Sequence, residues 1–269
     1  MVAVQPAANA IVRLLARTSL EPWHVVACHT VLGFLAAGLV ATRQPGNWLA
    51  AAALLQVKTV LDNADGGLAR ATGRVTEFGR YLDTVCDLAV NVALFAALAS
   101  HGAAGGGGLG AAAAALGSAT ALVIVTLALS ADFGAQKRYE EARGLGARPT
   151  PVAPARRDPW YLAFVRGVYR TVLAPQDRAY QAMDGALFRL AGGTAWDAAT
   201  AGQRQRWADL FSTGALVNLG LSTQYLALGV ALALGMPYAY VVICWCQLPY
   251  LLAVQALRVA RYRAAEGRR

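Results

Sequence analysis

Four aspartates between residues 62 and 87 have the spacing that two helices need to gather carboxylates in one place. Asp62 and Asp65 are three residues apart, and Asp83 and Asp87 are four apart, so each pair shares one face of a helix. Only a short link separates the two pairs, and the helices that carry them are expected to be antiparallel neighbours. The sequence therefore predicts that four carboxylates converge at one end of a helix pair.

Converging carboxylates repel one another, so this arrangement needs positive charge nearby. Arg70 and Arg74 could neutralise part of the charge, but divalent cations such as Mg²⁺, Mn²⁺ or Ca²⁺ suit oxygen ligands better. Two such ions, about 3.5–4 Å apart, could hold a diphosphate and stabilise its departure. Gly66, Gly67 and Gly79 lie beside the acids, and their missing side chains would leave room for a bulky ligand. These residues could therefore hold two divalent ions that bind a diphosphate.

The composition indicates that these helices lie in a membrane. Hydrophobic residues make up 57% of the chain and charged residues only 14%, whereas soluble domains carry about 25% charged residues. A helix needs about 20 mostly apolar residues to cross a bilayer, and the chain has about six such stretches. The predicted fold class is an all-α integral membrane protein. The predicted spans are 23–42, 46–69, 79–101, 107–131, 208–234 and 236–260.

The distribution of basic residues orients the predicted spans. The links at 43–46, 105–108 and 235–237 contain a single arginine, whereas the opposite face collects most of the arginines near the spans. Because Lys and Arg concentrate on the cytoplasmic side, we expect both termini and the aspartates in the cytoplasm of a multi-pass cell-membrane protein. The same tendency explains the net charge of +9. No nucleic-acid-binding motif accompanies that charge, so no nucleic-acid partner is expected.

Two segments are expected to lie on the membrane rather than across it. Residues 1–20 contain apolar positions that Arg13 and Arg17 interrupt, which predicts an interfacial amphipathic helix rather than a signal peptide. The segment 132–207 is the most basic part of the chain, and apolar residues recur at helical spacing in its second half. It is too short to bury a large core of its own. We therefore expect 1–269 to form a single membrane domain, with 132–207 as a cytoplasmic or interfacial insertion.

The aspartates belong to a longer pattern. Residues 62–87 match D-x2-D-G-x2-A-R-x8-G-x3-D-x3-D at every fixed position, and through this motif the chain resembles the CDP-alcohol phosphotransferase family. The resemblance covers this segment in detail and elsewhere extends to the number and orientation of the spans. It implies six transmembrane helices with an N-terminal interfacial helix, assembled as a homodimer. The fixed positions are Asp62, Asp65, Gly66, Ala69, Arg70, Gly79, Asp83 and Asp87.

The resemblance also implies a chemistry. An acceptor hydroxyl would attack the β-phosphorus of a CDP-linked donor, CMP would leave, and Asp87 would be the general base. CDP-diacylglycerol is the expected donor and a small polar alcohol the expected acceptor, in phospholipid biosynthesis among membrane lipids. The resemblance implies two divalent ions, with Mg²⁺ or Mn²⁺ expected, and their implied ligands are Asp62, Asp65, Asp83 and Asp87. The implied contacts to the CDP moiety are Gly66, Ala69, Arg70 and Gly79.

Several other polar residues have two interpretations. Lys58, one turn before Asp62, could pair with an aspartate or a phosphate, or could extend towards the membrane surface. The three histidines, at 24, 29 and 101, are interpreted as interfacial polar residues. A phosphate-bearing acceptor would need basic residues, which could equally attract lipid headgroups. The candidates are Lys137, Arg138, Arg166 and Arg170.

Two other functions remain open at this point. A membrane prenyltransferase also uses aspartate-rich motifs to hold Mg²⁺ and a diphosphate, although the Asp-Gly-x2-Ala-Arg stretch argues against it. A divalent cation transporter could use the carboxylates as an ion path. Clustering of the acids at one end of the spans disfavours a transporter.

Overall fold

The computed structural model describes residues 4–102, 108–145 and 160–267, and those residues form helices joined by turns, without strands. The all-α membrane fold predicted from the composition is confirmed. The chain divides into two compact units, which are described separately. The single membrane domain expected over 1–269 stays a prediction. Residues 105–107 of the expected glycine link and residues 146–159 of the basic segment lie outside the described residues.

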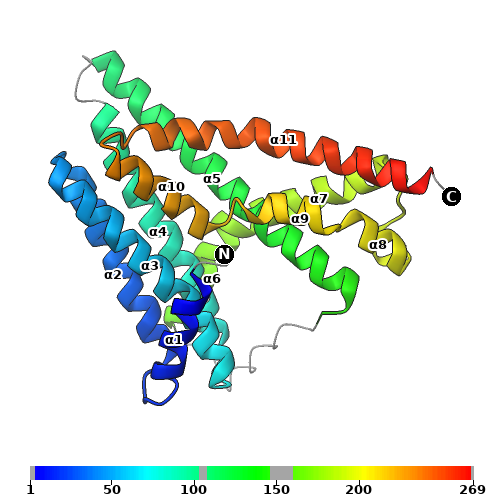
Figure 1. The fold of residues 1–269 in the computed structure, drawn as a ribbon, viewed down its shortest axis with the longest axis horizontal. Helices are drawn as coiled ribbons and strands as arrows, with labels where there is room; N and C mark the ends of the chain where they lie inside the picture. The colour runs from blue at the N-terminus through cyan, green and yellow to red at the C-terminus, as the bar shows by residue number, and fades with distance from the viewer. Residues whose placement is uncertain (1–3, 103–107, 146–159, 268–269) are drawn as a thin grey trace. The chain divides into compact units, whose positions relative to one another are not determined.

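The first unit contains the helices that carry the predicted site. Helix α2 packs along both α3 and α4, while α1 and α10 pack against α3 and α6 packs against α4 (Figure 1). The first part of α5 and the start of α11 complete this unit. The helices are α1 (Gln5–Leu15), α2 (Pro22–Ala41), α3 (Pro45–Ala71), α4 (Glu77–Gly102), α5 (Gly108–Arg143), α6 (Trp160–Val168), α10 (Leu221–Ala233) and α11 (Ala239–Glu266).

The turn between α3 and α4 is built by ordinary helix-end chemistry. Gly73, with a φ of +68°, follows the end of α3 in a left-handed conformation that favours glycine. The backbone N–H of Arg74 then donates to the carbonyl of Ala69. At the start of α4 the hydroxyl of Thr76 accepts the backbone N–H of Gly79 at 3.0 Å. These contacts close a short link, so the aspartates at the end of α3 face those near the start of α4.

Close packing brings α2 against α4. A Cβ on Gly33 would lie 2.6 Å from Val90 Cγ1, nearer than real side-chain contacts allow. Glycine at this position therefore permits α2 to approach α4. The approach matters because the residue one helical turn before Gly33 is His29, which is fully buried.

Two short helices of the first unit lie near the motif. The predicted N-terminal amphipathic helix is α1, whose Ala8 is fully buried. A Cβ on Gly67 would lie 2.9 Å from Val12 Cγ2, so this glycine makes room for α1 rather than for a ligand. Helix α6 lies against the start of α4, where Arg166 pairs with Glu77 at 3.1 Å. The basic segment thus supplies a helix that packs against the start of α4, the helix that carries Asp83 and Asp87.

The second unit has its own core and a buried ion cluster. Asp184, with its side chain 2% exposed, accepts a hydrogen bond from Arg258 Nη1 at 2.5 Å and one from Trp207 Nε1 at 3.2 Å. Phe188 and Tyr262 pack on the Trp207 ring. Besides parts of α5 and α11, the unit contains α7 (Ala174–Leu190), η3 (Trp196–Ala198), α8 (Ala201–Trp207) and α9 (Leu210–Val217), and the π-helical turn η2 (Tyr169–Leu173) joins α6 to α7.

Asp209 caps the start of α9. Its side chain accepts the backbone N–H of Ser212 at 3.0 Å and the Ser212 hydroxyl at 2.7 Å, and Arg261 lies 3.4 Å away. Burial acts to raise the pKa of Asp209. The two hydrogen bonds from Ser212 and the charge of Arg261 outweigh burial, so the pKa lies below its ordinary value.

Among the described residues, four helices are long and apolar enough to cross a membrane, namely α2, α4, α5 and α11. The sequence predicted about six spans, and two features explain the difference. Helix α3 has 27 residues, about 40 Å at 1.5 Å per residue, but its second half carries the charges of the motif. The stretch predicted as one span at 208–234 is divided into two helices, α9 and α10. If this bent pair is one broken span, it is a fifth candidate span among the described residues.

Candidate functional site

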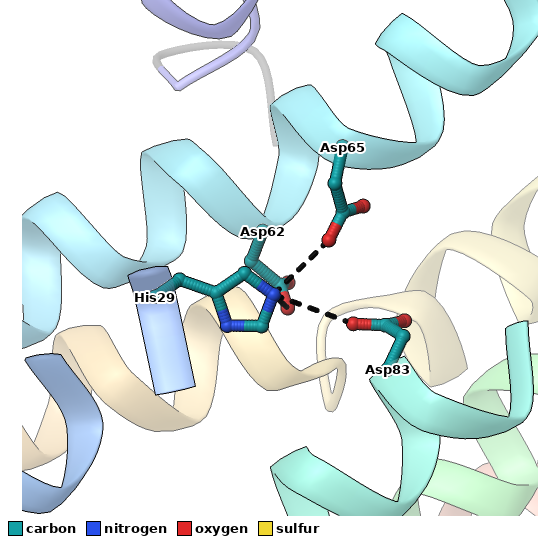
Figure 2. Close-up of side chains that lie close together, drawn as sticks. All are labelled: His29, Asp62, Asp65 and Asp83. Carbon is teal, nitrogen blue, oxygen red and sulfur yellow. Dashed lines mark hydrogen bonds and ion pairs between the residues drawn. The ribbon is translucent and has the colours of Figure 1, made fainter. Parts of the chain in front are cut away.

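Three helices of the first unit deliver one histidine and three carboxylates to a common point. His29 comes from α2, Asp62 and Asp65 come from α3, and Asp83 comes from α4 (Figure 2). One ligand atom from each of these side chains lies within 4.8 Å of the others. The predicted convergence is therefore confirmed for Asp62, Asp65 and Asp83.

His29 lies at the centre of this group. Its Nε2 atom is 3.0 Å from Asp65 Oδ2, 3.5 Å from Asp83 Oδ1 and 3.9 Å from Asp62 Oδ1. The side chain is 0% exposed. The interpretation of His29 as an interfacial polar residue was therefore wrong.

A signal for His29 was present in the sequence. His29 shares a helical face with Val26, Gly33, Ala36 and Val40, all of them buried. Small and apolar residues at this spacing indicate a packed face. A histidine on that face cannot reach water and must find polar partners inside the protein.

Asp87 belongs to the same site, but its partner is Lys58 rather than His29. Lys58 Nζ donates to Asp87 Oδ1 at 2.7 Å and lies 3.7 Å from Asp62 Oδ1, and the lysine side chain is 0% exposed. Of the two interpretations of Lys58, the structure selects pairing with aspartates. The lysine links Asp87 to Asp62, one of the three carboxylates around His29.

Residues of α10 contact Lys58 and the end of α3. The Lys58 ammonium lies 4.8 Å from the centre of the buried Tyr225 ring, and the Tyr225 hydroxyl donates to Asn91 Oδ1 at 3.0 Å. Asn63, within the motif, donates to Ser222 Oγ at 3.2 Å. These contacts position the lysine and the end of α3 through residues that no motif singled out.

The three converging aspartates suit a divalent cation. Asp62 Oδ1 and Asp83 Oδ1 are buried and accept no hydrogen bond within the protein. Buried carboxylate oxygens without hydrogen-bond partners are costly. Among the described residues, the side chains that ion-pair with Asp62 or Asp83 are His29 and, for Asp62, Lys58. Hard oxygen donors of this kind match the ligand preferences of Mg²⁺ and Mn²⁺. The residues present therefore fit the metal site that the motif predicts.

The residues expected to contact CDP continue from the carboxylates along both helices. Gly66, Ala69 and Arg70 occupy the last turns of α3, and Gly79 lies in the first turn of α4. A Cβ on Gly66 would be 3.3 Å from Arg70 Nη1, so the bare backbone at Gly66 leaves space beside the guanidinium. The structure thus places these four positions next to the acidic cluster, and their contact with a nucleotide stays a prediction.

Three of the four basic residues considered for an acceptor phosphate have carboxylate partners. Arg166 pairs with Glu77, as described above. In the second unit, Arg138 lies 3.4 Å from Asp184 and Lys137 lies 3.9 Å from Glu141. Arg170 is exposed in the turn that follows α6. The structure does not single out an acceptor-binding arginine among them.

Comparison with known proteins bears on the same region. A family model described as CDP-alcohol phosphatidyltransferase matches residues 15–151, about half of the chain. A curated protein of Aquifex aeolicus (strain VF5), the bifunctional IPC transferase and DIPP synthase, is 50% identical over 48 residues. That alignment covers 18% of this chain and 11% of the relative. The chain therefore matches only a small part of that relative's length.

Proposed function

The chain belongs to the CDP-alcohol phosphatidyltransferase family, and from this premise we propose that it transfers a phosphatidyl group from CDP-diacylglycerol to the hydroxyl of a polar alcohol. Family membership itself supports the coarser statement, transfer of a phospho-alcohol group from a CDP-alcohol with an alcohol as acceptor. The donor lipid and a role in phospholipid biosynthesis are the parts that we propose. The fraction of apolar residues and the membrane-length helices favour a lipid donor.

The observation that carries the proposal is the convergence of Asp62, Asp65 and Asp83 within 4.8 Å. We propose that these residues and Asp87 hold two divalent ions, Mg²⁺ or Mn²⁺. Bound there, the ions would offset the negative charge of the donor's diphosphate. The buried carboxylate oxygens that accept no hydrogen bond support this assignment.

We propose Asp87 as the general base. Its Oδ1 atom is engaged by Lys58, so the carboxylate is oriented before the acceptor arrives and Oδ2 would take the hydroxyl proton. The acceptor oxygen would form a bond to the β-phosphorus as the bond from that phosphorus to the bridging oxygen breaks, and CMP would leave. Lys58 is thus a positioning residue for the base.

The remaining motif positions would bind the nucleotide. Gly66, Ala69 and Gly79 would let the backbone approach the cytidine diphosphate, and Arg70 would pair with a phosphate. A site at the arginine-rich ends of the spans faces the cytoplasm under the positive-inside tendency. We propose a homodimer in the cell membrane, with that orientation.

The test is CMP release by the purified protein. In lipid–detergent micelles with CDP-diacylglycerol and Mg²⁺ or Mn²⁺, a panel of polar alcohols should contain an acceptor that raises CMP release well above the rate without alcohol. Asp87→Asn should reduce that rate by about 10²–10⁴-fold if the carboxylate acts as the base. Asp197→Asn, which changes an exposed aspartate of the second unit in the same way, should leave the rate unchanged.

Three outcomes would contradict the proposal. CMP release that Asp87→Asn leaves intact would refute the base assignment. Binding of a prenyl diphosphate without binding of a cytidine nucleotide would favour a prenyltransferase. Metal flux in proteoliposomes, without CMP chemistry, would favour a transporter.

A further inference from the structure

We propose that His29 is a direct metal ligand, through Nε2, of one of the divalent ions that the proposed function places among the aspartates. The motif supplies only oxygen ligands, and His29 lies outside it, on α2. The inference rests on the metal centre of the proposed function and adds a nitrogen ligand to it. It also makes the site more selective among ions than four carboxylates would be.

The distances around Nε2 carry the inference. Two atoms that bind one ion, each about 2.1 Å from it, can be at most about 4.2 Å apart. Nε2 lies 3.0, 3.5 and 3.9 Å from oxygens of Asp65, Asp83 and Asp62. Each of the three pairs is therefore close enough to share an ion with the imidazole. Two of the three are longer than a good hydrogen bond.

The surroundings of the imidazole ring also indicate that Nε2, rather than Nδ1, is the ligand atom. The His29 side chain is fully buried, and its other nitrogen, Nδ1, makes no hydrogen bond within the protein. All polar contacts of His29 therefore run through Nε2, which points at the carboxylates (Figure 2). Two of the oxygens that it faces, Asp62 Oδ1 and Asp83 Oδ1, are themselves buried without hydrogen bonds.

A nitrogen ligand changes which ions the site prefers. Carboxylates suit Mg²⁺, Ca²⁺ and Mn²⁺, whereas imidazole suits first-row transition metals. Mn²⁺ accepts both ligand types, while Mg²⁺ gains little from the imidazole. We therefore expect the intact protein to prefer Mn²⁺ over Mg²⁺ more strongly than a variant that lacks the imidazole.

The competing explanation is that His29 is only a counter-ion. A charged imidazole could balance the carboxylates in the metal-free protein and lose its contact with them when ions bind. The two explanations differ in one observable, which is the presence of nitrogen in the coordination shell of the bound ion.

Pulsed electron paramagnetic resonance of the Mn²⁺-loaded protein measures that nitrogen directly. The full chain in detergent, purified without a histidine tag and without any CDP substrate, should show electron spin echo modulation from a directly bound ¹⁴N nucleus. Labelling the histidines with ¹⁵N should replace that signal by the ¹⁵N pattern, which identifies the ligand as a histidine without any mutation. The chain has three histidines, so the double variant His24→Gln/His101→Gln should retain the signal.

Substitution of His29 supplies the affinity test. His29→Gln should abolish the nitrogen modulation and weaken Mn²⁺ binding, measured by titration of the free-Mn²⁺ signal, by about tenfold or more. Its Mg²⁺ affinity, measured by competition with Mn²⁺, should fall less. The ¹⁵N experiment, together with the His24→Gln/His101→Gln variant, keeps the proposal testable even if His29→Gln does not fold.

The outcomes separate this inference from the proposed function. Bound Mn²⁺ without nitrogen coupling would overturn the role of His29 and leave the aspartate metal centre standing. An unsubstituted chain that binds no Mn²⁺ would overturn both. Nitrogen coupling that persists in His29→Gln would assign the ligand to another histidine and refute the inference.

Discussion

Replacing Lys58 by methionine should destabilise the protein strongly when divalent ions are absent and much less when they are present. The substitution keeps a long apolar side chain but removes the charge. In the structure that charge is fully buried, 2.7 Å from Asp87 Oδ1 and 3.7 Å from Asp62 Oδ1. Without it, both carboxylates lose the cation that Lys58 supplies.

The magnitude follows from this geometry. At 2.7 Å and an effective dielectric constant of about 20, the attraction between two unit charges is about 6 kcal/mol. Desolvation of the ammonium offsets part of it, but removing one partner of a buried pair typically costs about 3–5 kcal/mol because the other charge stays behind. For a chain of this size that loss corresponds to a fall of about 6–20 °C in the unfolding midpoint.

Divalent ions should reduce this loss. An ion bound by the same carboxylates replaces the missing positive charge, and at saturating ion each tenfold by which the variant binds the ion more tightly than the unsubstituted protein recovers about 1.4 kcal/mol. The Lys58→Met protein should also bind Mn²⁺ more tightly than the unsubstituted protein, because the lysine no longer competes for Asp87 and Asp62.

Thermal unfolding in detergent, followed by tryptophan fluorescence with EDTA or with Mn²⁺, measures both effects. The matched control is Lys137→Met, since the Lys137 side chain is 49% exposed and lies 3.9 Å from Glu141. It should change the free energy of unfolding by no more than about 1 kcal/mol. Equal midpoints for Lys58→Met and the unsubstituted protein in EDTA would refute the reasoning, as would a loss that Mn²⁺ does not reduce.

Three further substitutions test the packing, ion-pair and capping arguments, each followed by thermal unfolding. Gly33→Ala places a Cβ 2.6 Å from Val90 Cγ1 and should cost about 1–3 kcal/mol, whereas Gly38→Ala, with open space around it on the same helix, should be neutral or stabilise by up to about 1 kcal/mol. A destabilised Gly38→Ala protein would contradict this contrast. Asp184→Asn leaves a buried arginine without its counter-ion and should cost about 3–5 kcal/mol; an unchanged midpoint would show that the ion cluster does not stabilise the second unit. Asp209→Ala removes the α9 cap and should cost about 1 kcal/mol at neutral pH. Since the folded pKa of Asp209 lies below its ordinary value, its contribution is complete above pH ~4 and is lost as the pH falls through the folded pKa, so a difference that does not shrink as the pH falls below ~4 would argue against an ionised cap.

The all-α membrane fold and the meeting of the aspartates were predictable because both depend on local rules. Low charge with long apolar runs leaves the helix as the structure that satisfies every backbone group in lipid. Spacings of three and four residues place Asp62 with Asp65, and Asp83 with Asp87, whatever surrounds them. Family membership followed from the same short motif.

The partners of those aspartates were not predictable, because they depend on which third helix packs against α3 and α4. Once α2 lies along both, the small Gly33 allows close approach and His29 enters the carboxylate cluster. The same packing buries Lys58 against Asp87.

By itself, then, the sequence determined the fold class, the family and the face on which each aspartate lies, since backbone hydrogen bonding and helix periodicity act within a few residues. Only the tertiary structure decided that His29 and Lys58 belong to the site, that Gly67 accommodates Val12 of α1, and that the stretch 208–234 is divided. These outcomes follow from contacts between helices that are far apart in the chain. At such contacts the packed surfaces of the helices must fit one another, and each buried charge must meet a partner.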